Sequence, residues 1–299
     1  MNPKNQSALR VAWWCLLCCF GPTGLFAKDT QRERFTLNSE NGKVTYVVDA
    51  WLPKSYLANP RPFPVLLMLD GEYAFSSAVQ LSEYLQRNGE IKEFIIVGVS
   101  YDIGFGKPLA VERTRDFTPP FDEHRVIKKS ETAYYRFVKD RLLPELHARF
   151  QIDPAQRTLW SYSLSGSFAM WLNYFDPTLF DHFIVASGNA DFGILPKLFQ
   201  RQIFQGAKGS GRKVFFSYDT TEVMDPKVME DAKKLLADKE AFPGYEMKLL
   251  LTTGESHASS WFVSLPAALR FVFGSGDGAG ASKFPAANAP ANAASSAQP

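Results

Sequence analysis

The apolar residues of this chain fall into short, nearly continuous runs separated by stretches with helical spacing. Runs of this kind are typical of strands buried on both faces of a sheet. Between several of them, segments such as 131–150 and 226–240 carry apolar residues at every third or fourth position, which predicts amphipathic helices. Strands that alternate with helices predict an α/β fold with a mainly parallel central sheet flanked by helices. The runs are 63–71, 94–100, 157–163, 182–188, 213–219 and 245–252.

The N-terminal part of the chain shows a different pattern of apolar residues. Residues 34–38 and 43–52 alternate between apolar and polar side chains, as half-buried antiparallel strands do. Asn41 and Gly42 lie between them, and this pair suits the positive φ angles of a tight turn. We therefore expect an N-terminal antiparallel hairpin.

Both ends of the chain differ in composition from the part between them. Residues 1–27 contain Lys4 and Arg10, an apolar run over 11–20 and no acidic residue, which predicts a signal peptide cleaved near Ala27. A membrane anchor, the alternative, would need about 20 apolar residues. Residues 274–299 are rich in Gly, Ala, Pro, Asn and Ser and predict a disordered low-complexity tail. This leaves 28–273 as one domain, which we expect in the periplasm or outside the cell.

The composition excludes several kinds of site and partner for the expected mature chain. All three cysteines, Cys15, Cys18 and Cys19, lie in the leader, so disulfides and thiolate metal sites are not expected. The leader also holds two of the 33 basic residues and none of the 31 acidic ones, which leaves 31 of each. A body without excess positive charge argues against a nucleic acid partner. We expect no stable membrane insertion after cleavage.

Ser163 stands where a buried-strand pattern ends and an apolar helix pattern begins. An α/β hydrolase places its nucleophilic serine on such a turn, within G-x-S-x-G. Here Ser161 and Ser165 occupy the two glycine positions. We interpret them as small residues that fit a tight turn, so that glycine at both positions should preserve activity. The alternative is an ordinary polar turn.

A serine nucleophile needs a base, and position selects one histidine. His257 follows the last predicted strand, where this fold class places its histidine. His147 falls within a helix pattern and His182 opens a strand, which favours structural roles for both. The fourth histidine is His124.

The other parts of such a site are a third, acidic residue and two N–H donors for an oxyanion. The acid should follow the strand at 213–219, where Asp219, Glu222 and Asp225 are all candidates. Leu164, directly after the serine, should supply one backbone N–H. Glu72 should supply the other, because Gly71 lets the chain bend after the early strand.

Four segments together resemble the Putative esterase family of α/β hydrolases, which includes siderophore esterases of the enterobactin type, S-formylglutathione hydrolase, feruloyl esterases and mycolyltransferases. The resemblance covers roughly 33–273. Its segments are "LLMLDGEYAF", "IIVGVSYD" with "ERTRDFTPP", "LWSYSLSGSFAMW" and "GESHASSWFVSLPAALRFVF".

The resemblance implies an α/β-hydrolase fold, with Ser163 as nucleophile, His257 as base and backbone donors at Glu72 and Leu164. In the siderophore branch a strand ending in G-x-x-E supplies the acid. Aligning "FFSYDTTE" with that pattern favours Glu222 and puts Asp219 in the place of the glycine.

The function expected from these residues is a serine esterase that forms an acyl-enzyme on Ser163, with a siderophore or another small acyl ester as substrate. No metal or organic cofactor is needed for that chemistry. Two alternatives are an acyltransferase that uses the same site and a binding protein that keeps the fold without turnover.

The resemblance extends to a long predicted loop, residues 101–129. Arg115 and Asp116 are expected to pin this loop through a paired charge. Phe117, Pro119, Pro120 and Phe121 could form the wall of an acyl or aromatic pocket.

Overall fold

The fold is taken from a computed structural model of the chain. It describes residues 31–59, 61–103, 109–120, 130–188, 211–222 and 242–275, with isolated positions between 230 and 238. The predicted leader and nearly all of the predicted tail lie outside these residues. No helix in the described segments is both long and apolar enough to cross a membrane.

The described strands form one eight-stranded sheet in the order β1-β2-β4-β3-β5-β6-β7-β8. All neighbours from β4 to β8 pair in parallel, while β1 pairs with β2, and β2 with β4, in antiparallel fashion. The predicted mainly parallel sheet and its six strands are confirmed, but β8 lies at the edge of the sheet and is only partly buried. The strands are β1 (Arg32–Asn38), β2 (Thr45–Trp51), β3 (Phe63–Met68), β4 (Ile95–Tyr101), β5 (Ile152–Tyr162), β6 (His182–Ala186), β7 (Arg212–Asp219) and β8 (Tyr245–Thr252).

The N-terminal hairpin is also confirmed, although its turn is wider than the Asn-Gly pair predicts. The backbone N–H of Ser39 donates to the Val44 carbonyl at 2.8 Å, so six residues connect β1 and β2. Only Gly42 of the expected pair has a positive φ, 69°. The Asn41 side chain instead accepts hydrogen bonds from the Ser39 hydroxyl and the Lys43 N–H, which close the loop from within.

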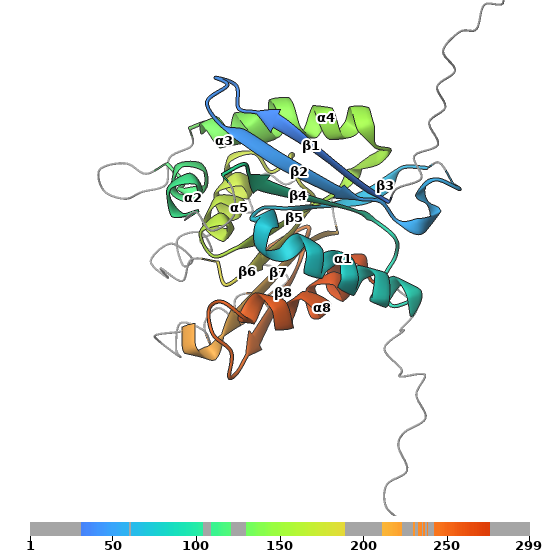
Figure 1. Ribbon diagram of the computed structural model, residues 1–299. Coiled ribbons are helices and arrows are strands. Elements are labelled where there is room, and N and C mark those ends of the chain that lie inside the picture. The colour runs from blue at the N-terminus through green and yellow to red at the C-terminus, as the bar shows by residue number, and fades with distance from the viewer. Residues whose placement is uncertain are drawn as a thin grey trace, which may run out of the picture.

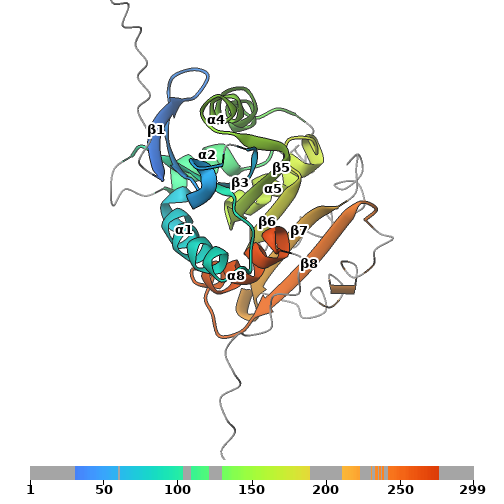
Figure 2. The same cartoon turned by 90° about the vertical axis from the view of Figure 1, so that its right-hand side faces the viewer.

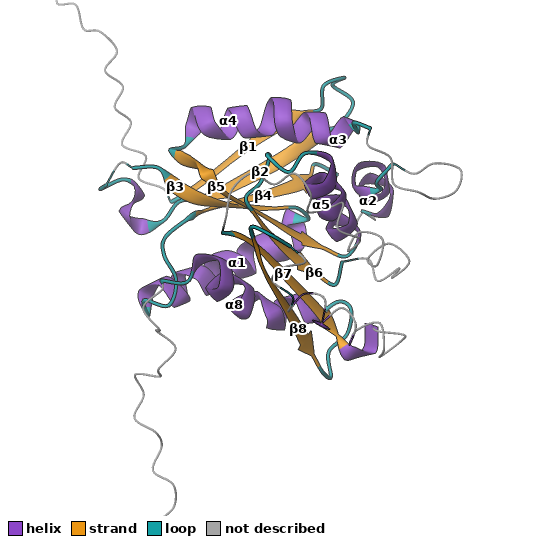
Figure 3. Ribbon diagram, turned by 180° about the vertical axis from the view of Figure 1, so that it is seen from behind, coloured by secondary structure: helices purple, strands orange, loops and turns teal. Residues whose placement is uncertain are grey.

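Helices cover both faces of the sheet. Figures 1 and 3 show α1 and α8 on one face and α2, α3, α4 and α5 on the other, and Figure 2 shows the twist of the sheet between β1 and β8. The α-helices whose bounds fall within the described residues are α1 (Gly71–Arg87), α2 (Ala110–Phe117), α3 (Ala133–Arg136), α4 (Leu143–Arg149), α5 (Leu164–Phe175) and α8 (Ser260–Phe273). Three short elements are a π-helix at Phe137–Leu142 and 3-10 turns at Lys54–Tyr56 and Thr220–Glu222.

Two apolar cores, one on each face, explain why the central strands contain few polar residues. Side chains alternate between the faces of a strand. In β3, Leu67 therefore packs into the core under α5 with Phe168, whereas Leu66 and Met68 pack into the core under α1 and α8 with Leu269. All five side chains are fully buried.

Of the two predicted helices, one is present and the other lies largely outside the described residues. The helix expected at 131–150 is present as the continuous series α3, π-helix and α4, while the one expected at 226–240 falls largely outside the described residues. The expected loop 101–129 contains α2, so that part of the prediction was wrong.

Phe117 ends α2 and is 1% exposed, because it packs edge to face against Tyr134. It belongs to the core and not to a pocket wall; Phe121 lies outside the described residues.

The expected pairing of Arg115 with Asp116 is confirmed. The Arg115 guanidinium donates to both carboxylate oxygens of Asp116 at 2.8 Å, and the hydroxyl of Tyr46 donates to the same carboxylate at 2.9 Å. The pair thereby fastens α2 to β2.

His182, at the start of β6, allows a prediction about stability. Its Nδ1 accepts the backbone N–H of Lys213 at 3.0 Å, and burial, with further contributions from Lys213 and Arg212, lowers the pKa of His182 to about 4. The unfolded chain therefore binds the proton more tightly, and the stability contributed above the ordinary pKa of 6.5 should be lost as the pH falls toward 4.

We expect this loss to be on the order of 1–3 kcal/mol of unfolding free energy, measured by urea denaturation at several pH values. His182→Asn, which keeps an acceptor for the Lys213 N–H, should show a correspondingly shallower decline. Parallel curves for the two proteins would contradict the assignment.

Candidate active site

Backbone strain concentrates at the carboxyl edge of the sheet. In the described residues, three non-glycine residues have a positive φ: Asp70 at 55°, Ser163 at 57° and Ser187 at 45°. They follow β3, β5 and β6, which are adjacent strands in the order β3-β5-β6. Such conformations cost about 1–3 kcal/mol each and persist where the surroundings enforce them, commonly at functional sites. The strain therefore indicates a site at this edge.

Ser163 forms a sharp turn between β5 and α5, as the sequence predicts. Its φ of 57° and ψ of −119° are stabilised by two backbone hydrogen bonds. The Ser163 N–H donates to the Ala186 carbonyl at 3.0 Å, and the Ser163 carbonyl accepts the N–H of Gly166 at 2.9 Å. The side chain is partly exposed, unlike those of Ser161 and Ser165, which are fully buried. Of the three serines, Ser163 alone faces His257.

His257 lies in the loop between β8 and α8. Its Nε2 is 2.9 Å from the Ser163 hydroxyl oxygen, although the two residues are 94 positions apart. The Tyr162 hydroxyl donates to the His257 carbonyl at 2.7 Å and so fastens this loop to the end of β5. Burial raises the pKa of Tyr162 to about 12, so the phenol stays a hydrogen-bond donor well into the alkaline range. His257 itself is 53% exposed, so the site opens toward solvent.

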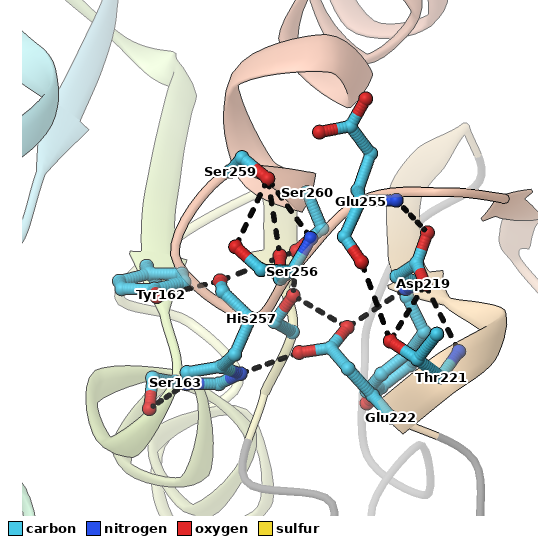
Figure 4. A network of polar contacts seen from close by, with 12 residues as sticks. Tyr162, Ser163, Asp219, Thr221, Glu222, Glu255, Ser256, His257, Ser259 and Ser260 are labelled. Carbon is cyan, nitrogen blue, oxygen red and sulfur yellow. Dashed lines mark hydrogen bonds and ion pairs between the residues drawn. The ribbon is translucent and has the colours of Figure 1, made fainter.

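Glu222 completes a chain of three side chains, drawn in Figure 4. One carboxylate oxygen contacts His257 Nδ1. The other accepts the N–H of Asp219 at 2.7 Å and the hydroxyl of Ser187 at 3.0 Å. The Glu222 side chain is only 7% exposed. Both oxygens are thus committed, and the carboxylate has one orientation.

The other two acid candidates do not take this position. Asp219 is fully buried, and its carboxylate accepts hydrogen bonds from Thr221, Thr252 and Glu255, away from His257. The N–H of Thr221, with the other donors, lowers the pKa of Asp219. In the place of the expected glycine, Asp219 therefore shapes the turn that carries Glu222. Asp225 lies outside the described residues, as does His124.

The two expected N–H donors lie at the first turns of two helices, where backbone N–H groups have no partner within the helix. Leu164 opens α5, and Glu72 is the second residue of α1. The chain bends differently from our expectation, because the left-handed residue is Asp70 and not Gly71. Gly71 is required for close packing, since a Cβ there would lie 2.8 Å from the Ser100 hydroxyl oxygen and 3.0 Å from the backbone of Gly98.

Four residues around the site escaped the sequence analysis: Asp70, Arg113, Tyr162 and Ser187. Tyr162 and Ser187 adjoin predicted strand ends, so their positions could have been noted. Their partners, His257 and Glu222, are separated from them by 95 and 35 residues, which no local pattern reveals. His147 and His182 lie in α4 and β6, as predicted. Within the described segments, no three His, Cys, Asp or Glu side chains cluster as metal ligands would.

Comparison with known proteins gives the family of this chain. The family model described as Putative esterase matches residues 39–258, and the chain belongs to that family. Its curated relatives include the ferri-bacillibactin esterase BesA of Bacillus subtilis, 26% identical over a 164-residue alignment that covers 50% of this chain and 56% of BesA. Another is the siderophore triacetylfusarinine C esterase of Aspergillus fumigatus, 25% identical over 184 residues, 59% of this chain and 62% of the relative. The matches thus span less than two thirds of each relative.

Solved structures show the same fold. The BES protein from Bacillus cereus superimposes with a TM-score of 0.64 at 23% identity, over 82% of this chain and 96% of that one. An IroE-like serine hydrolase from Shewanella oneidensis gives a TM-score of 0.64 at 19% identity, over 81% and 80% of the two chains. The α/β-hydrolase fold expected from the sequence is therefore confirmed.

Proposed function

We propose that this protein is a serine esterase that hydrolyses a carboxylic ester through an acyl-enzyme on Ser163. The observation that carries the proposal is the continuous contact from the Ser163 hydroxyl through His257 to Glu222, on a turn with strained backbone. Membership of the Putative esterase family supports it independently.

In this proposal the Ser163 hydroxyl oxygen attacks the ester carbonyl carbon, and His257 Nε2 takes the hydroxyl proton. The carbonyl oxygen becomes an oxyanion, which the N–H groups of Leu164 and Glu72 stabilise. The bond to the alcohol oxygen then breaks, and His257 returns its proton to that oxygen. Water, activated by the same imidazole, attacks the acyl-serine and releases the carboxylic acid. Glu222 holds the Nδ1 proton and stabilises the imidazolium in both halves.

For the substrate we propose a small-molecule ester of the siderophore type. The support is that the two curated relatives named above are siderophore esterases by name. A hydrolysis screen over a siderophore triester, a short acyl ester, a feruloyl ester and a glycolipid should give its highest kcat/KM with the siderophore. A preference for any other class would redirect the assignment of the substrate.

We place the protein in the periplasm or outside the cell, on the basis of the leader at 1–27. The intact mass of protein recovered from those compartments should correspond to a chain beginning near Lys28. An uncleaved mass would contradict this.

A fluorophosphonate probe tests the nucleophile. We expect one adduct per chain, which mass spectrometry should map to Ser163 and not to Ser161 or Ser165, because those two side chains are buried. A folded sample that acquires no adduct would instead favour the alternative of a binding protein without turnover.

A further inference from the structure

Ser165 replaces a glycine of the expected motif, yet it does more than fill space. Its hydroxyl donates to a carboxylate oxygen of Asp70 at 2.6 Å and lies 2.9 Å from the Tyr162 carbonyl oxygen. The same hydroxyl oxygen accepts the N–H of Tyr162 at 2.8 Å. Ser165 and Asp70 are both fully buried and stand 95 residues apart. A glycine at 165 could make none of these side-chain contacts.

Arg113, on α2, is the third member of this group and is partly buried, with 16% of its side chain exposed. Its guanidinium donates to both carboxylate oxygens of Asp70, at 2.7 and 3.0 Å, and to the Tyr162 carbonyl at 3.1 Å. Burial raises the pKa of Asp70, whereas Arg113 and the Ser165 hydroxyl oppose that rise. Asp70 and Arg113 are therefore held together by a paired contact.

Asp70 connects the N-terminal ends of two helices. Its strained backbone begins α1, whose second residue is Glu72, while its side chain reaches into the first turn of α5, which begins at Leu164. The two proposed oxyanion donors belong to helices on opposite faces of the sheet. The contact between Asp70 and Ser165 is a direct link between their N-termini.

Ser161, the other serine at a glycine position, makes no such link. It is equally buried, but its hydroxyl donates only to the Ile184 carbonyl of the neighbouring strand, at 3.2 Å. The closest backbone approach at this turn falls instead at Gly166, where a Cβ would lie 2.7 Å from the Cα of Gly188. The structure thus separates two serines that the sequence analysis treated alike.

We propose that Ser165, with Asp70 and Arg113, is a positioning residue that fixes the N–H groups of Leu164 and Glu72 relative to one another and so preorganises the oxyanion hole. This inference rests on the proposed esterase function. It also reverses our expectation that glycine at 161 and 165 preserves activity, because glycine at 165 would remove the link.

Kinetics of Ser165→Ala and the matched control Ser161→Ala test the proposal. Each change removes one buried hydroxyl from the same turn. Complete loss of an oxyanion donor costs about 10²–10³ in kcat, so loosening two donors should lower kcat by about 10- to 100-fold. KM should change little, because the donors act chiefly on the transition state. Ser161→Ala should retain kcat within about threefold, since it leaves the donors in place.

Binding of a boronic acid distinguishes displaced oxyanion donors from a general loosening of the fold. A loosened fold would weaken the binding of boronic acid and of product alike. The boronate forms a tetrahedral adduct on Ser163 whose oxygen occupies the oxyanion position, so its affinity should fall in proportion to kcat/KM in Ser165→Ala. The alcohol product of the reaction, which carries no acyl oxygen, should bind both variants as it binds the parent. Equal kinetics and boronate affinity for the two serine variants would overturn the inference.

Two more variants cover the case in which Ser165→Ala fails to fold. Ser165→Gly restores the usual motif residue and should show the same loss. Arg113→Lys keeps the charge but loses the paired donors to Asp70, and should lower kcat and boronate affinity together. If the parent protein neither hydrolyses esters nor reacts with fluorophosphonate, the proposed function is wrong. If the parent is active and these variants match it, the proposed function stands and only this inference is wrong.

Discussion

Replacing Ser163 with alanine should abolish ester hydrolysis, with a loss of at least about 10⁴ in kcat, because no acyl-enzyme can then form. The change removes one hydroxyl from a partly exposed side chain. The backbone bonds that hold the turn, from Ser163 N–H to Ala186 and from Gly166 N–H to Ser163, do not involve that hydroxyl. The variant should therefore fold normally and still bind substrate, with unchanged thermal unfolding.

The measurement is hydrolysis of an activated aryl ester, followed by fluorophosphonate labelling of the same samples. Ser161→Ala is the matched control, because it changes the same residue type two positions away and should keep both activity and labelling. Hydrolysis that survives in Ser163→Ala would exclude the proposed mechanism, whatever the behaviour of the control.

Glu222→Gln should lower kcat by about 10²–10⁴, although glutamine has nearly the same shape as glutamate. Two donors, the Asp219 N–H and the Ser187 hydroxyl, face one carboxylate oxygen. They should bind the amide oxygen of glutamine and so turn its NH2 group toward His257 Nδ1. The imidazole would then carry its proton on Nε2, facing Ser163, where it cannot accept the hydroxyl proton. The loss thus arises from the wrong tautomer in an intact site.

Asp225→Asn is the control for this prediction and should be nearly silent. Thermal unfolding distinguishes the proposed cause from a general disturbance, because a wrong tautomer in an intact site should leave the unfolding temperature of Glu222→Gln unchanged while kcat falls. If Asp225→Asn were the damaging change and Glu222→Gln the silent one, the placement of the acid would be wrong.

The sequence by itself determined the layered sheet and the position of the central serine. Runs such as 94–100 and 182–188 are apolar at consecutive positions, and a strand with both faces covered is the structure that such a run favours. Ser163 and His257 were found because each lies at the end of a predicted strand, and the carboxyl ends of parallel strands meet at one edge. These inferences need only local pattern and chain order.

Tertiary structure alone decided which side chains meet at that edge. Asp219 and Glu222 are three residues apart and chemically alike, yet one shapes a turn and the other contacts His257, because Asp219 ends β7 whereas Glu222 ends the 3-10 turn that follows it. Ser161 and Ser165 are identical in type and spacing from Ser163, but only Ser165 meets Asp70, which lies 95 residues away. Contacts over such separations depend on how β3 and β5 pair and how α1 and α5 begin, and no short window of sequence contains that information.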